Sequence, residues 1–248
     1  LTVRAGSVHA VVGENGAGKS TLLHVVAGLV RADAGALTID GAGIDLATHT
    51  VARARALGVG LVQQHPVAAP QLSVVENAVL GDEPVRRGRL DLGPAAAALV
   101  ALGARLGLPI DPMAQVAALQ VAARQRAEIV VALWRGARIL ALDEPTALLA
   151  PAEIDGLLDV LRRLATAGTT VVLVTHRLDE VARVADDVTV LRRGATVAAY
   201  PATTLAAQIA ADIIGAAPPA APPRARREPG AVRLALREVA GGALTAGK

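Results

Sequence analysis

The strongest constraint on the fold is one glycine-rich turn and its two flanks. Residues 13–20, Gly-Glu-Asn-Gly-Ala-Gly-Lys-Ser, fit the pattern G-x-x-x-x-G-K-[ST]. The nearly continuous apolar run at 8–12 precedes them and is typical of a strand buried on both faces. Residues 19–28 follow as a predicted helix that ends at a glycine. This strand, turn and helix predict an α/β fold with an anion-binding loop.

The residue types of this turn indicate a nucleotide triphosphate. Glycines let backbone N–H groups turn inward onto phosphate oxygens, and the helix that follows adds about half a positive charge at its start. Lys19 is predicted to reach the β- and γ-phosphates, and the Ser20 hydroxyl to ligate Mg²⁺. The predicted ATP contacts are Gly13, Glu14, Asn15, Gly16, Ala17, Gly18, Lys19, Ser20 and Thr21.

A second segment places two acids directly after an apolar strand. Residues 139–142 are apolar, and Asp143 and Glu144 follow them. Because strands of a parallel sheet deliver their last residues to the edge where phosphates bind, Asp143 is the expected Mg²⁺ partner. Glu144 lies on the opposite side of the strand and is placed to polarise the attacking water.

Two uncharged or weakly basic side chains follow further strands. His176 comes after the strand predicted at 170–174. A lone histidine is more often structural, but a place beside the γ-phosphate favours a catalytic role. Gln64 follows the strand predicted at 58–62 and is able to contact both Mg²⁺ and water; its neighbour Gln63 is an alternative that spacing alone does not exclude.

The rest of the chain alternates between strand and helix patterns. Alternation of this kind predicts a mainly parallel sheet with flanking helices. Apolar residues make up 53% of the chain and aromatics 1%, so the core is expected to consist of Ala, Val, Leu and Ile. Residues 36–40 are predicted to be an edge strand that ends in a turn at 41–43. One further strand is predicted at 188–191, and helices are predicted at 94–108, 121–135, 151–165 and 178–185.

Composition excludes several classes of protein. The absence of cysteine excludes disulfides and thiolate metal sites. With a net charge of +3 and scattered arginines, no nucleic-acid binding is expected, and the short basic run at 224–227 is interpreted as a solvated linker. No stretch approaches the ~20 apolar residues that span a bilayer, and no signal peptide is visible. The first residue is not Met, so we expect the true N-terminus to be missing.

In this order the motifs resemble those of an ABC-type ATPase. The Walker A motif is at 13–21, the Q-loop at Gln64, the Walker B motif at 139–144 and the switch histidine at His176. The resemblance covers residues 1 to about 215 and selects Gln64 over Gln63. It implies a P-loop fold with an antiparallel β edge and a helical signature subdomain at about 65–135.

Three stretches are similar to the ATPases of simple-sugar and nucleoside importers: residues 72–81, 125–129 and 143–151. That family carries two ATPase halves in one polypeptide. We therefore expect an ATPase domain at 1–215, a Pro/Ala/Arg-rich linker at 216–230 and the incomplete start of a second ATPase domain at 231–248; a disordered tail is the alternative for the last segment.

This resemblance implies an energy-coupling subunit at the cytoplasmic face of the membrane. Its partners would be a second ATPase half, transmembrane permease subunits and, indirectly, a solute-binding protein. Residues 65–81 would lie near the coupling helices of the permease. The sequence does not name the solute.

The signature loop departs from the family pattern. Where the family has Leu-Ser-Gly-Gly-Gln, residues 119–123 read Leu-Gln-Val-Ala-Ala, so that Gln120 replaces the serine and Ala122 the second glycine. The D-loop aspartate is also missing near Ala150. In a head-to-tail pair of halves, each signature faces the other half's P-loop. We expect the site at residues 13–20 to hydrolyse ATP, and the site served by 119–123 to turn over slowly.

Two other interpretations of the function stay open. A pseudoenzyme that binds nucleotide without turnover is favoured by the damaged signature and opposed by Glu144 and His176. A soluble ABC protein acting on ribosomes or DNA would need a long basic linker or a coiled-coil insertion, and neither is visible. The adenine-stacking aromatic of the family would precede Leu1, so we expect weak ATP binding by this chain alone.

Overall fold

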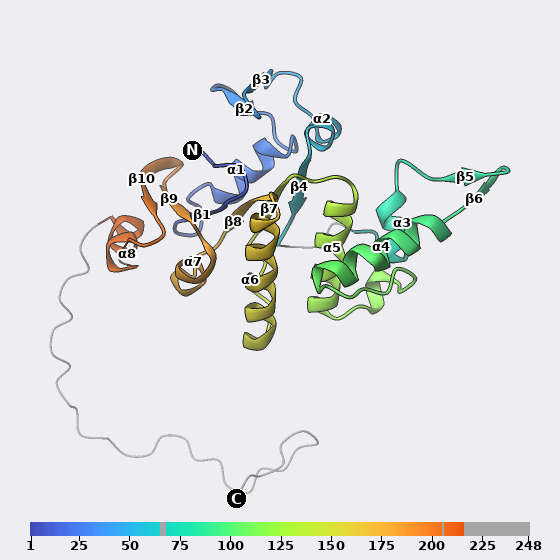
Figure 1. The fold of residues 1–248 in the computed structure, drawn as a ribbon. Coiled ribbons are helices and arrows are strands. Elements are labelled where there is room, and N and C mark those ends of the chain that lie inside the picture. The colour runs from blue at the N-terminus through green and yellow to red at the C-terminus, as the bar shows by residue number, and fades with distance from the viewer. Residues whose placement is uncertain (65–67, 205, 216–248) are drawn as a thin grey trace, which may run out of the picture. The chain divides into compact units, whose positions relative to one another are not determined.

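A mainly parallel sheet forms the centre of the structure (Figure 1). The computed structural model describes residues 1–64, 68–204 and 206–215, and within them six strands form this sheet in the order β10-β9-β1-β8-β7-β4. All neighbours are parallel except β9 and β10, which are antiparallel. The strands are β1 (Val8–Val12), β4 (Val59–Val62), β7 (Ile139–Asp143), β8 (Thr170–Val174), β9 (Asp187–Arg192) and β10 (Ala195–Pro201). The predicted fold class, including its antiparallel edge, is confirmed.

Helices cover both faces of the sheet because strand residues alternate between them. Leu140 and Leu142 of β7 pack with α6 in one apolar cluster, whereas Ala141 between them packs with Leu23 of α1. Toward the β9 end, α7 and α8 bury residues such as Val181 against β1 and β9. These helices are α1 (Lys19–Val26), α6 (Pro151–Thr166), α7 (Leu178–Val184) and α8 (Ala206–Ile214). The core is aliphatic, as the composition predicted.

A helical group stands beside β4, within the span predicted for the signature subdomain (Figure 1). The capping box of Ser73 and Glu76 fixes the start of its first helix. A small hairpin, which the sequence patterns did not reveal, interrupts the group. Its elements are α3 (Val74–Val79), β5 (Val85–Arg86), β6 (Arg89–Leu90), α4 (Gly93–Leu106), the 3₁₀ turn η1 (Val116–Ala118) and α5 (Val121–Trp134).

The turn predicted at residues 41–43 was placed too late. Asp40 and Gly41 both have positive φ (51° and 79°) and form the turn themselves. Strand β3 (Ala42–Ile44) starts directly after it and pairs with β2 (Leu37–Ile39) in a separate two-stranded sheet. The short helix α2 (Val51–Ala56) then leads into β4.

The described residues, which end at Gly215, belong to one compact unit. The predicted linker at 216–230 and the predicted partial domain at 231–248 lie outside the described residues. In the part of the chain that the structure describes, no helix is long and apolar enough to cross a membrane.

Candidate functional site

Four adjacent parallel strands deliver the predicted site residues to one edge of the sheet. Strands β1, β8, β7 and β4 are neighbours, and their carboxyl ends are in register: Val11 pairs with Val174, Val174 with Asp143, and Leu142 with Val62. The glycine-rich turn follows β1, His176 follows β8, Glu144 follows β7 and Gln64 follows β4. An α/β sheet binds its ligands at this edge, beyond the carboxyl ends of the strands.

The backbone of the glycine-rich turn requires glycine at positions 13, 16 and 18. Gly16 and Gly18 have φ of 80° and 99°, a region that side chains with a Cβ rarely adopt. A Cβ at Gly13 would collide with the carbonyl oxygen of Leu191 in β9. The turn is therefore held close against the sheet while its backbone curves toward the start of α1.

Lys19 is folded back into this turn. Its buried ammonium donates hydrogen bonds to the carbonyl oxygens of Gly13 (2.8 Å) and Glu14 (3.1 Å). An ammonium has three donors, so two of them hold the loop and one is left for a ligand oxygen. The side chain thus lies where the sequence predicted a phosphate contact.

Asp143 has an open coordination position in its buried carboxylate. The residue is 5% exposed, and its Oδ1 has no hydrogen-bond partner among the described residues. A buried, unpaired carboxylate oxygen is costly unless a cation or donor meets it. Together with the Ser20 hydroxyl it offers the oxygen ligands that Mg²⁺ prefers, so the residues fit this ion.

Mg²⁺ here would also depend on the nucleotide. In the described ranges, no cluster of three or more His, Cys, Asp and Glu could hold a metal ion. One carboxylate and one hydroxyl are too few for a protein-only site, and Mg²⁺ is commonly completed by phosphate oxygens and water.

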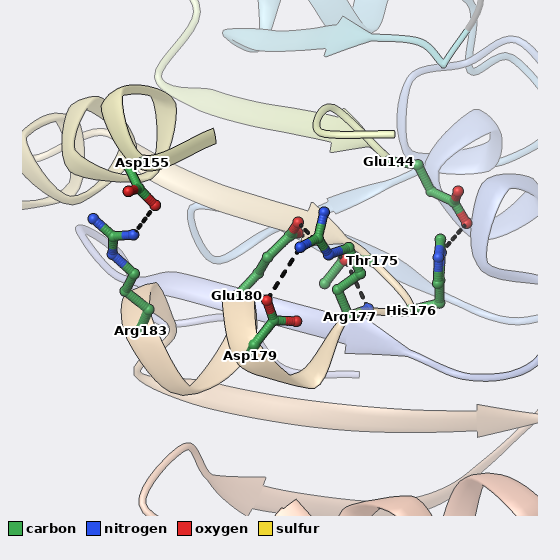
Figure 2. Close-up of polar contacts among 8 residues, drawn as sticks. All are labelled: Glu144, Asp155, Thr175, His176, Arg177, Asp179, Glu180 and Arg183. Atoms are coloured by element: carbon green, nitrogen blue, oxygen red, sulfur yellow. Dashed lines mark hydrogen bonds and ion pairs between the residues drawn. The ribbon is translucent and has the colours of Figure 1, made fainter. Parts of the chain in front are cut away.

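Glu144 and His176 meet across the ends of β7 and β8 (Figure 2). The imidazole Nδ1 lies 3.3 Å from Glu144 Oε1; the Glu144 side chain is 15% exposed and that of His176 53%. Glu144 has φ of 46°, in the left-handed region that a residue with a Cβ adopts at a cost of about 1–3 kcal/mol. Its N–H donates to the carbonyl oxygen of Val174 (3.0 Å), which fixes this turn to the neighbouring strand. The structure therefore brings the two predicted catalytic residues together.

The two glutamines and Glu144 border one cavity of about 80 Å³. Gln63, Gln64 and Glu144 all line it, and so does Gln125 of α5. Gln125 donates a hydrogen bond to the carbonyl oxygen of Pro145, which ties α5 to the segment after β7. Both glutamines reach the cavity, so the geometry alone does not distinguish between them.

The signature segment lies at the start of α5. Gln120 is the residue before the helix, and its side chain makes no capping hydrogen bond. Arg124 instead holds the segment, since its Nη2 donates to the carbonyl oxygens of Val116 (3.0 Å) and Leu119 (3.4 Å). The loop is thus ordered by an arginine that the sequence reasoning missed.

Glu128, one helical turn after Arg124, was also missed. Burial raises the pKa of the Glu128 carboxyl to about 7, and the nearby Arg124 partly opposes this effect. Its Oε1 is buried and has no hydrogen-bond partner within the described residues. The i, i+4 spacing of an arginine and a glutamate on a predicted helix was the available signal; nothing in the sequence indicated that the pair is buried.

We expect Glu128→Gln to stabilise the protein at pH 8 and not at pH 4. Because the folded-state pKa lies above the unfolded one, the native state holds the proton longer, and the stability that this gives is lost as the pH rises from about 4.5 to 7. Discounted for partial exposure, the gain of the variant at pH 8 is about 1–2 kcal/mol. Urea unfolding across this pH range measures it, with Asp33→Asn, an exposed carboxylate, as the control. A pH-independent difference between Glu128→Gln and the parent would contradict the expectation.

A parallel sheet with a glycine-rich phosphate loop after its first strand defines the class of P-loop nucleotide-binding proteins. The family model described as "ABC transporter" matches residues 1–147. The chain belongs to this family.

Its relatives and structural neighbours agree. The chain is 42% identical over 232 residues to the ribose import ATP-binding protein RbsA 1 of Rubrobacter xylanophilus, covering 94% of the chain and 46% of that protein. It is 41% identical over 199 residues to the nucleoside import ATP-binding protein NupA of Lactococcus lactis, covering 79% and 38%. The chain thus spans less than half the length of both relatives.

Solved ATP-binding cassettes share the fold. A nucleotide-free cassette from an ABC transporter has a TM-score of 0.70 at 23% identity, with 87% of each chain covered. The ADP conformation of the cassette MJ1267 has a TM-score of 0.69 at 24% identity, with 86% of each covered.

Proposed function

We propose that this chain is the ATP-binding and ATP-hydrolysing domain of an energy-coupling subunit in an ABC importer for simple sugars or nucleosides. The observation that carries the proposal is the convergence of Lys19, Asp143, Glu144 and His176 on one sheet edge. The names of the ribose and nucleoside import relatives support the solute class.

In this proposal, different residues of the chain bind the phosphates, hold Mg²⁺ and orient the attacking water. Backbone N–H groups of the glycine-rich turn and Lys19 bind the phosphates of ATP. Ser20 and Asp143 would hold Mg²⁺, which neutralises phosphate charge when bound. Glu144 accepts a hydrogen bond from the attacking water and orients it. His176, held by Glu144 at its Nδ1, is left with Nε2 for the γ-phosphate, and Gln64 extends toward the same water.

A groove of about 390 Å³ beside the site supports a permease partner. Residues of β4, α3 and α5 line it, and most are apolar, such as Leu61, Val74 and Val131. Gln63 and Glu128 line both this groove and the smaller cavity that Glu144 borders. A cytoplasmic helix of the permease in the groove would therefore lie next to the catalytic carboxylate, which provides a route for coupling. We therefore propose that the domain is peripheral and lies at the cytoplasmic face of the membrane.

We further propose that residues 1–215 are one ATPase domain, followed by a linker at 216–230 and the start of a second ATPase domain at 231–248. The relatives' greater length supports this division. The second half would complete the ATP site with its own signature loop, and a solute-binding protein would deliver the solute to the permease.

Reconstitution tests the function. The full protein is assembled in vesicles with its permease and binding protein, and ATP-dependent uptake of ribose and of a nucleoside is measured. We expect uptake of one of them and its loss in Glu144→Gln. ATP turnover that is indifferent to permease and binding protein, with salt-dependent RNA affinity, would favour the soluble ribosome- or DNA-acting class instead. Nucleotide binding without turnover in the assembled complex would favour the pseudoenzyme.

A separate prediction concerns the signature segment. In the full two-half protein carrying Glu144→Gln, residual turnover comes from the site that residues 119–123 face. We expect it to be low and to rise about tenfold when Gln120→Ser and Ala122→Gly restore a hydroxyl donor and close backbone approach. Phosphate release measures it, with Ala118→Gly in the preceding 3₁₀ turn as the control. If Glu144→Gln alone keeps half of the parent rate, the signature is not impaired.

A further inference from the structure

Glu180 is a charged side chain buried in the fold beside the switch histidine. It lies in the first turn of α7, four residues after His176, and is 1% exposed. Burying a carboxylate is costly unless close partners meet it, and apolar residues of similar volume often serve a core equally well. The contacts of the Glu180 carboxylate should therefore explain why a charged residue is buried at this position.

The partners of Glu180 are the two residues that flank His176 (Figure 2). The Thr175 hydroxyl donates to Glu180 Oε2 (3.0 Å), and the Arg177 Nε forms an ion pair with Glu180 Oε1 (3.1 Å). The Arg177 backbone N–H in turn donates to Thr175 Oγ1 (3.0 Å). One buried carboxylate thus closes a ring of contacts around the backbone of His176.

Figure 2 shows the other side of this arrangement: the imidazole of His176 points away from the ring and toward Glu144. The His176 side chain is 53% exposed, so few neighbouring side chains restrict it. Apart from its contact with Glu144, the direction of the imidazole depends on the backbone of His176, which the flanking contacts hold. The chain between β8 and α7 is short, which leaves Thr175 and Arg177 as the points where it is held.

We propose that Glu180 is a positioning residue for His176: by holding Thr175 and Arg177 it fixes the backbone from which His176 reaches Glu144 and the γ-phosphate. The inference rests on the proposed function, in which His176 takes part in hydrolysis. Glu180 itself does not contact the nucleotide. Its effect belongs in the rate of the chemical step and not in ATP binding.

Asp179 provides a matched control. It is the neighbouring acid in the same first turn and also pairs with Arg177 (3.2 Å), but its side chain is 71% exposed and lies outside the ring. Arg183, later in α7, pairs with Asp155 of α6 on the surface. Exposed pairs of this kind contribute little, so Asp179→Asn removes only an exposed contact of Arg177, and a variant of Arg183 reports on α7 away from the ring.

The test is a double-mutant cycle on ATP hydrolysis by the full protein with its permease. We expect Glu180→Ala to lower kcat about tenfold and to change the KM for ATP less than twofold, whereas Asp179→Asn and Arg183→Ala stay within about twofold of the parent. His176→Ala is expected to lower kcat about 100-fold, and adding Glu180→Ala to it should lower kcat no further. Glu180→Gln keeps an acceptor for Thr175 and should recover most of the rate.

Two variants of Thr175 keep the proposal testable if the Glu180→Ala protein does not fold. Thr175→Ser keeps the hydroxyl and should retain the rate, while Thr175→Val removes it at similar volume and should match Glu180→Ala. Effects of Glu180→Ala and His176→Ala that multiply, or a silent Glu180→Ala with an inactive His176→Ala, would overturn the positioning role alone. An active His176→Ala would instead overturn the role of His176 in the proposed function.

Discussion

Replacing Glu144 by Gln is expected to lower ATP hydrolysis by about 10²- to 10⁴-fold, the range of a general base, while ATP affinity changes little. Glutamine keeps the size and a hydrogen-bonding group but cannot polarise water as a carboxylate does. The adjacent Asp143 is untouched; its buried Oδ1, which has no hydrogen-bond partner among the described residues, is the oxygen proposed for Mg²⁺. His176 loses its charged partner but keeps its backbone contacts.

Steady-state phosphate release and ATP binding by calorimetry separate the two effects. Asp155→Asn, an exposed carboxylate on α6, serves as the matched control and should leave both unchanged. Loss of binding together with hydrolysis would mean that Glu144 holds the loop and not the water. An unchanged rate would support the pseudoenzyme reading.

Sequence patterns located the strands that carry the site because those strands are buried on both faces. Residues 171–174 are an unbroken apolar run after Thr170, and the predicted bounds of 170–174 equal those of β8. Strand β10 escaped prediction because it is an antiparallel edge that is largely exposed, so no apolar run marks it. The hairpin of β5 and β6 was not predicted for the same reason, because its strands are short and fully exposed.

The part of the site that lies at strand ends was predictable from the sequence. The positions of Asp143, Glu144 and His176 followed from strands that end in polar residues, and the structure places the last two within 3.3 Å. Glu180 and Glu128 gave no such signal, since burial of an acid on a helix depends on tertiary packing, which one sequence does not reveal. Only the family resemblance favours Gln64 over Gln63, because both side chains line the same cavity.

Replacing Lys19 by Met is expected to weaken ATP binding about 100-fold or more. Methionine has a similar length but supplies no donor and no charge, so the phosphates lose a charge-assisted hydrogen bond in a nearly buried place. The carbonyl oxygens of Gly13 and Glu14 lose their donor as well, which loosens the loop before ATP arrives. A loss of about 2.7 kcal/mol corresponds to this factor in affinity.

Lys19→Arg distinguishes charge from geometry at the same position. The planar guanidinium is larger and cannot place a single ammonium-like donor inside the turn, so we expect it to rescue binding poorly although the charge is kept. Calorimetry measures both variants, and Arg31→Met, at an exposed position after α1, is the control. Lys19 and Lys248 are the two lysines of the sequence, so an acyl-phosphate derivative of ATP should label the peptide that contains Lys19 and spare Lys248. Equal labelling of both lysines, or full rescue by arginine, would show that the ammonium of Lys19 does not meet the phosphates.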